Sequence, residues 1–186
     1  MPPTVKITKD DIIKTAMEGV RKHGEAALNA RAIAANLQCS TQPIFSNFAT
    51  MADLRKAVIF AVEELSAEYI KKEIEKNIYP PYKATGMAYI RFAKEEKELF
   101  HLLYMRNRSS EGEDEESSSF REMKKMVQEL TGLEEGSAAL FHLEMWTFTH
   151  GIATLVATEF CDLSFELIST MMTDAYQGLR KRYEKG

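Results

Sequence analysis

Apolar residues recur at intervals of three and four along most of this chain, the spacing that places them on one face of an α-helix. The first set contains Ile12, Ile13, Ala16, Met17 and Val20. Long runs in which apolar and polar residues alternate, the pattern of a β-strand, do not occur in the sequence. Glycine and proline contribute only nine and five of the 186 residues, while strong helix formers are common. The sequence therefore predicts an all-α protein of about nine helices.

Capping residues mark where the first helices begin. A helix N-terminus favours a side chain that accepts a hydrogen bond from a free backbone N–H group, and a carboxylate three positions later strengthens the signal. Such residues are Thr8 with Asp11, Asn29, Ser40, and Thr50 with Asp53. They predict a three-helix domain, 1–50, and a long helix, 51–77, that connects it to a second helical domain, 51–186. Further helices are predicted at 82–94, 96–107, 120–131, 137–159 and 164–183.

Residues 30–48, ARAIAANLQCSTQPIFSNF, contain two helical patterns with a short break between them. The first is expected to bury Ile33 and Leu37, and the second is expected to bury one edge formed by Ile44, Phe45 and Phe48. The second pattern also carries the hydrogen-bonding side chains Thr41, Gln42, Ser46 and Asn47. Two short helices joined by a turn of three or four residues form a helix-turn-helix, whose second helix enters the major groove of DNA. The segment therefore predicts double-stranded DNA as a partner.

Residues 12–58 resemble the DNA-binding domain of the TetR family of bacterial transcriptional regulators. The matching segments are RKHG, LNARAIAANL, STQPIFSNF and MADLRKAV. A shorter segment, WTFTHGIATLVA at 146–157, resembles the Trp-x-x-x-His-Gly signature in the C-terminal domain of one branch of that family. The resemblance implies an all-helical homodimer that binds DNA with its N-terminal domain and an effector with its C-terminal domain.

The same resemblance assigns the DNA contacts. It places one contact at Arg31, near the N-terminus of the second helix, and the others in and around the third helix. These are Ser40, Thr41, Gln42, Pro43, Phe45, Ser46, Asn47 and Thr50. Phe45 and Met51 stand where the family usually has a tyrosine and a lysine that contact phosphate, which predicts weaker nonspecific binding. Gln38 stands where the family usually has a glycine in a left-handed turn, at a cost of about 1 kcal/mol.

The last two predicted helices suggest a homodimer. Residues 137–159 are apolar nearly all round, and a helix of this kind needs partners on every side. Paired with their copies across a two-fold axis, the last two helices would form a four-helix bundle. The interface residues expected on this reading are Leu155, Phe165, Ile168, Met172, Ala175, Tyr176 and Leu179.

Aromatic residues of the C-terminal domain suggest an effector site. The candidates are Tyr89, Phe92, Phe100, Tyr104, Trp146 and His150. They can line an apolar cavity for a small molecule or fill a solid core, and His150 can equally be a packing residue. The only arginines in the neighbouring helices are Arg91, Arg106 and Arg108, so a mainly apolar effector is expected over a strongly anionic one.

Composition and motifs bear on the other classes of function. Residues 1–60 hold eight Lys/Arg and five Asp/Glu, and the remainder hold sixteen and twenty-three, so only the first third is basic. The sequence contains no Gly-rich phosphate loop, nucleophile elbow or His-Glu-x-x-His, and no cofactor or metal is expected. His142 and His150 lie about 12 Å apart along a helix and cannot chelate one ion.

Two distant cysteines and the lack of a signal peptide favour the cytoplasm, and the most apolar helix is too polar for a membrane. The sequence thus predicts a cytoplasmic transcriptional regulator, most simply a repressor of a palindromic operator, and not an enzyme. A helical adaptor for protein contacts, or a small helical enzyme, is the alternative. A gel shift with DNA separates the regulator from both.

Overall fold

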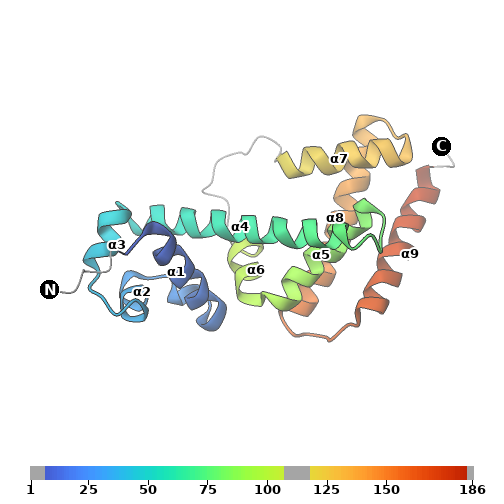
Figure 1. Ribbon diagram of the computed structural model, residues 1–186. Helices are drawn as coiled ribbons and strands as arrows, with labels where there is room; N and C mark the ends of the chain where they lie inside the picture. The colour runs from blue at the N-terminus through green and yellow to red at the C-terminus, as the bar shows by residue number, and fades with distance from the viewer. Residues whose placement is uncertain (1–6, 107–117, 184–186) are drawn as a thin grey trace. The chain divides into compact units, whose positions relative to one another are not determined.

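The computed structural model describes residues 7–106 and 118–183, and these residues form helices joined by short loops (Figure 1). The helices are α1 (Lys9–His23), a 3₁₀ turn (Glu25–Ala27), α2 (Ala30–Asn36), α3 (Gln42–Asn47), α4 (Met51–Glu75), α5 (Pro81–Glu95), α6 (Lys97–Tyr104), α7 (Ser118–Thr131), α8 (Glu135–Ala157) and α9 (Phe165–Tyr183). The described part contains no strand, so the predicted all-α class is confirmed. Among these helices, none has the length and apolar character that a bilayer span requires.

Most of the predicted caps begin the helices as expected. The Thr8 hydroxyl accepts a hydrogen bond from the backbone N–H of Asp11 at 3.1 Å, and the Asp11 carboxylate accepts one from the backbone N–H of Thr8 at 2.9 Å. Thr50 and Asp53 form the same reciprocal pair at the start of α4. The Asn29 side chain accepts from the backbone N–H of Ala32 at 2.9 Å. Each cap satisfies helix N–H groups that have no partner within the helix.

The start of α3 differs from the prediction. The N-cap is Thr41 and not Ser40, and its side chain makes no capping hydrogen bond. Pro43 lies in the first turn of α3, where its fixed φ and missing N–H favour helix initiation. Gln38, in the turn before α3, has φ of 53°, so the left-handed non-glycine residue expected there is present.

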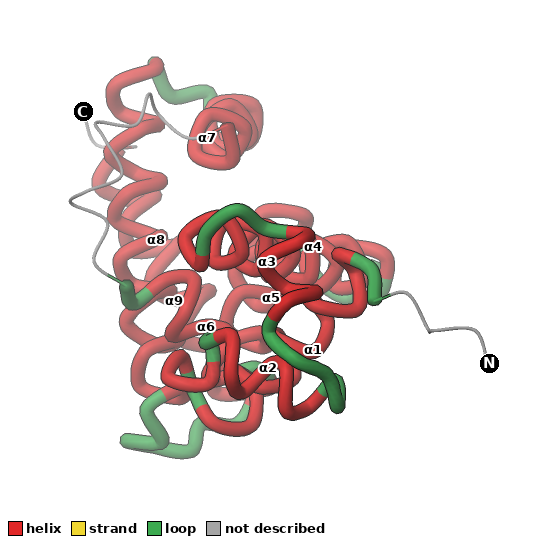
Figure 2. Tube along the Cα trace, turned by 90° about the vertical axis from the view of Figure 1, so that its left-hand side faces the viewer, coloured by secondary structure: helices red, strands yellow, loops and turns green. Residues whose placement is uncertain are grey.

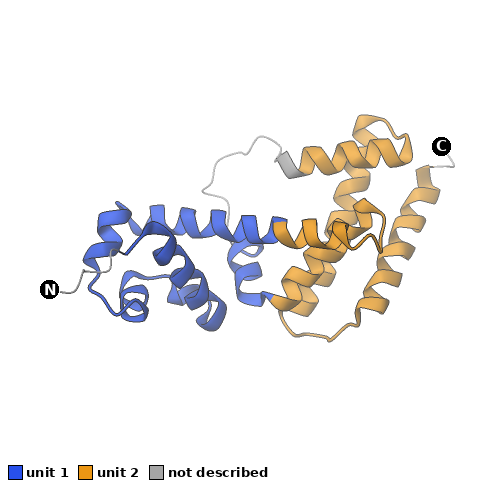
Figure 3. Cartoon of the chain, in the orientation of Figure 1, with its two compact units in different colours: residues 1–67, 96–106 blue, residues 68–95, 107–186 orange. Residues whose placement is uncertain are grey.

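The chain divides into two compact units, shown in different colours in Figure 3. Unit 1 consists of Met1–Ala67 and Glu96–Arg106, and unit 2 of Glu68–Glu95 and Asn107–Gly186. The long helix α4 contributes its first part to unit 1 and its last turns to unit 2. The domain boundary expected at residue 50 therefore falls inside unit 1, at the start of α4.

Unit 1 has one apolar core to which every one of its helices contributes. Its fully buried side chains include Ile12, Ile44, Leu54 and Phe100. Helix α6 packs against α1, and an ion pair joins the two at their surface. The Nε atom of Arg21 lies 2.7 Å from Glu96, and a second guanidinium nitrogen lies 3.0 Å from the other carboxylate oxygen. This bidentate geometry fixes the start of α6 against the end of α1.

Unit 2 is a layer of packed helices in which α8 is central. Helix α8 contacts α5, α7 and α9, and Figure 2 shows α8 and α9 side by side. Its buried side chains Phe141, Met145 and Ile152 belong to the apolar core of the unit, as do Ile90 of α5 and Ile168 of α9, and all are 3% exposed or less. Tight packing of this kind makes the unit sensitive to the loss of single methylene groups.

Candidate nucleic-acid interface and effector region

Helix α3 buries one edge and exposes another. Ile44 is fully buried and Phe48, just after the helix, is 7% exposed, so these two hold α3 in unit 1. Gln42, Phe45 and Ser46 are exposed, so the prediction that Phe45 belongs to the buried edge was wrong. Their spacing of three and four residues places them on one side of the helix. The structure thus places three of the predicted contact residues on a shared surface, which we call the α3 face.

The polar side chains near α3 differ in what they already bind. The Asn47 amide donates to the backbone oxygen of Pro43 at 2.8 Å and lies 3.5 Å from that of Ile7. Ser46 donates to the backbone oxygen of Gln42 at 2.9 Å. The side-chain amide of Gln42 makes no hydrogen bond among the described residues. Gln42 is therefore available to a ligand, whereas the donor groups of Ser46 and Asn47 are used within the protein.

The other predicted contact residues lie in the turn before α3, in the first turn of α3 and at the starts of α2 and α4. Arg31 is exposed in the first turn of α2 and has no ion pair among the described residues. Ser40 is exposed, while Thr41 and Pro43 are half-buried. Thr50 is exposed, and its hydroxyl lies 2.8 Å from the Asp53 carboxylate in the α4 cap. Arg31 is the only lysine or arginine between residues 24 and 54.

Three of the six residues predicted to line an effector site form a cluster in unit 2. The Tyr89 hydroxyl lies 2.8 Å from Nδ1 of His150. The Trp146 ring stacks on the His150 ring, with centroids 5.2 Å apart and planes 13° apart. Burial lowers the pKa of His150, which favours its neutral form. Trp146 is still 44% exposed, so this cluster reaches the surface of the unit.

Of the other three residues, one belongs to unit 2 and two belong to unit 1. Phe92 is fully buried in unit 2 and packs edge-on against Tyr69, with ring centroids 5.4 Å apart. Phe100 and Tyr104 belong to unit 1, where their rings contact each other at 5.2 Å. The Tyr104 hydroxyl lies 3.1 Å from that of Ser66. Phe100 and Tyr104 thus belong to the unit that holds α1 and α6, and a shared effector site for all six residues stays a prediction.

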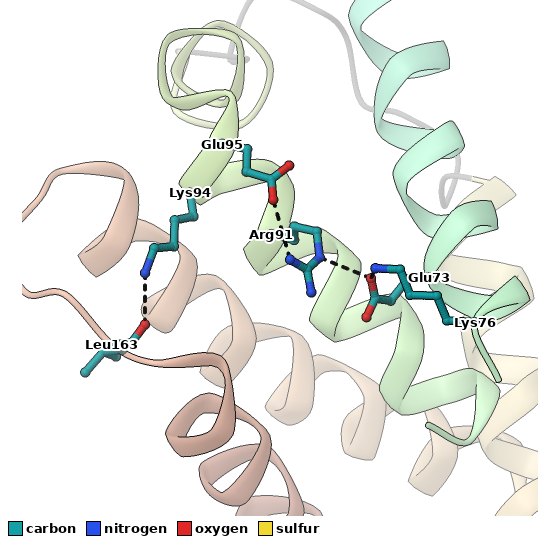
Figure 4. Close-up of polar contacts among 6 residues, drawn as sticks. All are labelled: Glu73, Lys76, Arg91, Lys94, Glu95 and Leu163. Carbon is teal, nitrogen blue, oxygen red and sulfur yellow. Dashed lines mark hydrogen bonds and ion pairs between the residues drawn. The ribbon is translucent and has the colours of Figure 1, made fainter. Parts of the chain in front are cut away.

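A polar network in unit 2 was not predicted from the sequence (Figure 4). The Glu73 side chain, at the end of α4, is 2% exposed and accepts from Nζ of Lys76 at 2.6 Å and from Nε of Arg91 at 3.1 Å. The Arg91 guanidinium also lies over the Phe165 ring, 4.0 Å from its centroid. Lys94 donates to the backbone oxygen of Leu163 at 3.1 Å. Arg91, one of the arginines considered for effector binding, is thus occupied by the protein itself.

A second unpredicted feature is the buried pair of Tyr82 and His142. The Tyr82 hydroxyl lies 3.0 Å from Nδ1 of His142. Burial lowers the pKa of His142 to about 4 and raises that of Tyr82, so both side chains are neutral at pH 7. The partners are 60 positions apart on different helices, and no local sequence signal indicates such a pair.

The predicted dimer residues are only partly exposed. Ile168 is fully buried and Met172 is 4% exposed, so both side chains pack in the core of unit 2, and their place in a dimer interface stays a prediction. Phe165, Ala175, Tyr176 and Leu179 are half-buried, and Leu155 is exposed. The exposed apolar side chains of α8 and α9 also include Leu140, Leu143 and Leu167. Sequence periodicity could not separate these from the buried positions, because α8 is apolar on every side.

Helices α8 and α9 each carry a glycine with open space beside it. A Cβ atom at Gly151 or Gly178 would meet no atom within 4 Å. Gly151 is exposed on α8 between Leu143 and Leu155 along the helix, at intervals of eight and four residues. We call the exposed side chains Leu140, Leu143 and Leu155 of α8 and Leu167 of α9, together with the two glycines, the α8–α9 face.

Comparisons with known proteins agree with this fold. Residues 82–173 match the family model described as Tetracyclin repressor-like, C-terminal domain, and this span includes Trp146, His150 and Gly151. The whole chain is similar to the crystal structure of a TetR-like transcriptional regulator from Rhodococcus sp. RHA1. The identity is 15%, the TM-score is 0.69, and the similarity covers 96% of this chain and 98% of the other, which shows a shared fold. No curated protein matches the sequence.

Proposed function

This chain belongs to the TetR family of transcriptional regulators, and from that premise we propose that it is a repressor that binds a palindromic DNA operator as a homodimer. It is a transcription factor and not an enzyme. The observation that carries the proposal is the α3 face, where Gln42 and Phe45 are exposed and Gln42 has no hydrogen bond within the described residues. As part of the same proposal, we expect the protein to act in the cytoplasm.

The α8–α9 face supports the homodimer. Its leucines are between 36% and 48% exposed, and a row of this length on two adjacent helices is unusual for a surface that faces only water. Gly151 and Gly178 allow a second helix to approach closely. A two-fold dimer joins identical patches, so one such face on each chain suffices to form a four-helix bundle.

Unit 2 is the proposed effector-binding part. The cluster of Tyr89, Trp146 and His150 combines apolar rings with a neutral polar pair, a suitable lining for a mainly apolar ligand with one hydrogen-bonding group. Such a ligand would release DNA only by binding the DNA-incompetent dimer more tightly. A 100-fold preference would contribute about 2.7 kcal/mol per site.

The proposal is tested first by selecting bound duplexes from random DNA with the purified chain. Enrichment of a palindromic site, confirmed by gel shift, supports a repressor, and the lack of any DNA binding would favour the adaptor alternative. Apolar compounds that raise the melting temperature are then added to the gel shift. Compounds that stabilise the protein but leave DNA binding unchanged at saturation would contradict the effector role.

A further inference from the structure

Phe45 is an exposed aromatic residue of α3 in unit 1. Its side chain is 49% exposed, whereas its neighbours Ile44 and Phe48 are 0% and 7% exposed. Its ring makes no aromatic or cation–π contact among the described residues. Exposing a phenylalanine to water is unfavourable, so a residue of this kind on a candidate binding surface points to an apolar group on the ligand.

The other side chains of α3 indicate which chemical groups that ligand presents. Helix α3, QPIFSN, contains no lysine or arginine, the side chains that read guanine most often. The side-chain amide of Gln42 makes no hydrogen bond among the described residues, and glutamine can form two hydrogen bonds to N6 and N7 of adenine. Ser46 already donates its hydroxyl hydrogen to the helix backbone. The surface thus offers one amide and one apolar ring, and in the major groove the apolar group of a base pair is the C5-methyl of thymine.

We propose that α3 reads A·T base pairs, with the Phe45 ring packed against a thymine C5-methyl and the Gln42 amide bonded to a nearby adenine. This inference rests on the proposed DNA-binding function. Gln42 and Phe45 are three residues apart, so their Cβ atoms lie about 5–6 Å from each other. Base pairs follow one another at about 3.4 Å, and the two side chains therefore reach base pairs one or two steps apart.

A phosphate contact is the competing role for this position. A phosphate oxygen accepts hydrogen bonds, and a phenylalanine ring has no N–H or O–H group to donate. The two roles differ in what they depend on, since the methyl contact requires a thymine at one position and a phosphate contact is independent of sequence. Removing the methyl group from the DNA separates them without changing the protein.

The experiment uses the full chain and the operator that it selects from random duplexes. Each thymine in one half-site is replaced in turn by deoxyuridine, which lacks only the C5-methyl, and binding is measured by gel shift. We expect one replacement to weaken wild-type binding about fourfold, the effect of losing one buried methyl-sized group. Phe45→Ala should bind the thymine operator more weakly than wild type and should no longer distinguish thymine from deoxyuridine there.

Phe60→Ala is the matched control. Phe60 is also an exposed phenylalanine of unit 1, 60% exposed on α4, and its loss should leave the thymine preference intact. Phe45→Tyr keeps the ring and should also keep the preference. The inference would be overturned, and DNA binding retained, if Phe45→Ala weakened binding to the thymine and deoxyuridine operators equally. The same conclusion would follow if deoxyuridine had no effect on binding at any position. A failure to select any DNA would overturn the proposed function together with it.

Discussion

At the scale of single residues, His142 makes the stability of the fold depend on pH. Its pKa is lowered to about 4 by burial, against an ordinary value of 6.5, so folding favours the neutral imidazole. The unfolded chain binds more protons between these two values. Stability should therefore be complete above pH 6.5 and fall as the pH drops toward 4, by at most about 3 kcal/mol in total.

Urea unfolding followed by circular dichroism between pH 4 and pH 7.5 measures this dependence. The double variant Tyr82→Phe/His142→Phe replaces both hydrogen-bonding partners by apolar rings, so it leaves no unpaired polar group. It should show a smaller loss of stability over the same pH range. An unchanged slope would mean that other groups cause the dependence.

Substitutions of Gln42 and Asn47 should have different effects, although both residues are amides of α3. Gln42→Ala removes only an exposed side chain and should weaken operator binding by about 1–3 kcal/mol without lowering stability. Asn47→Ala removes the hydrogen bond to Pro43 and should lower the free energy of unfolding by about 1 kcal/mol. Thermal unfolding and gel shifts on both variants test this, and equal melting temperatures would contradict it.

At the scale of elements, Glu73 should hold the last turns of α4 against α5. Glu73→Ala leaves Arg91 without its buried partner and should cost about 2 kcal/mol of stability. Glu75→Ala is the control, because the Glu75 carboxylate lies on the same helix, is exposed and only reaches Lys71 at 4.0 Å. Chemical unfolding measures the stability of the two variants. A similar loss of stability in both would contradict the proposed role of Glu73.

At the scale of the whole molecule, the α8–α9 face should form the dimer. Leu143→Glu combined with Leu155→Glu places charges on an exposed apolar row and should give folded monomers by light scattering. Ile78→Glu, at a 66% exposed apolar residue in the turn after α4, should remain dimeric. A wild-type chain that is monomeric at micromolar concentration would refute the interface.

Ile168→Asp tests whether Ile168 belongs to the dimer interface, as expected from the sequence, or only to the core of unit 2. The Ile168 side chain is fully buried in the core of unit 2, so an unpaired carboxylate there should unfold the unit instead of producing a folded monomer. Circular dichroism and light scattering on the same sample distinguish the two outcomes. A folded monomer with the wild-type melting temperature would show that Ile168 belongs to the dimer interface.

Features that depend on neighbours along the chain were predictable from the sequence. The caps at Thr8, Asn29 and Thr50 require only groups within three positions, and Gly24 ends α1 with φ of 71°. Helical spacing also predicted that Ile44 and Phe48 are buried and that Gln42 is exposed, but it placed Phe45 on the buried edge, where the structure leaves it 49% exposed. The caps were identified correctly because they depend on groups close along the chain, although the N-cap of α3 is one residue later than expected.

Only the tertiary structure decided which apolar residues are buried and which distant polar groups meet. Along α9, Ile168 is buried and its neighbour Leu167 is 48% exposed, yet both are apolar, so composition does not rank them. Glu73 meets Arg91, and Tyr82 meets His142, through packing between helices that no local pattern encodes. The same packing assigns α6, with Phe100, to unit 1. Helix formation depends on interactions a few residues apart, whereas these contacts depend on how whole helix faces fit together.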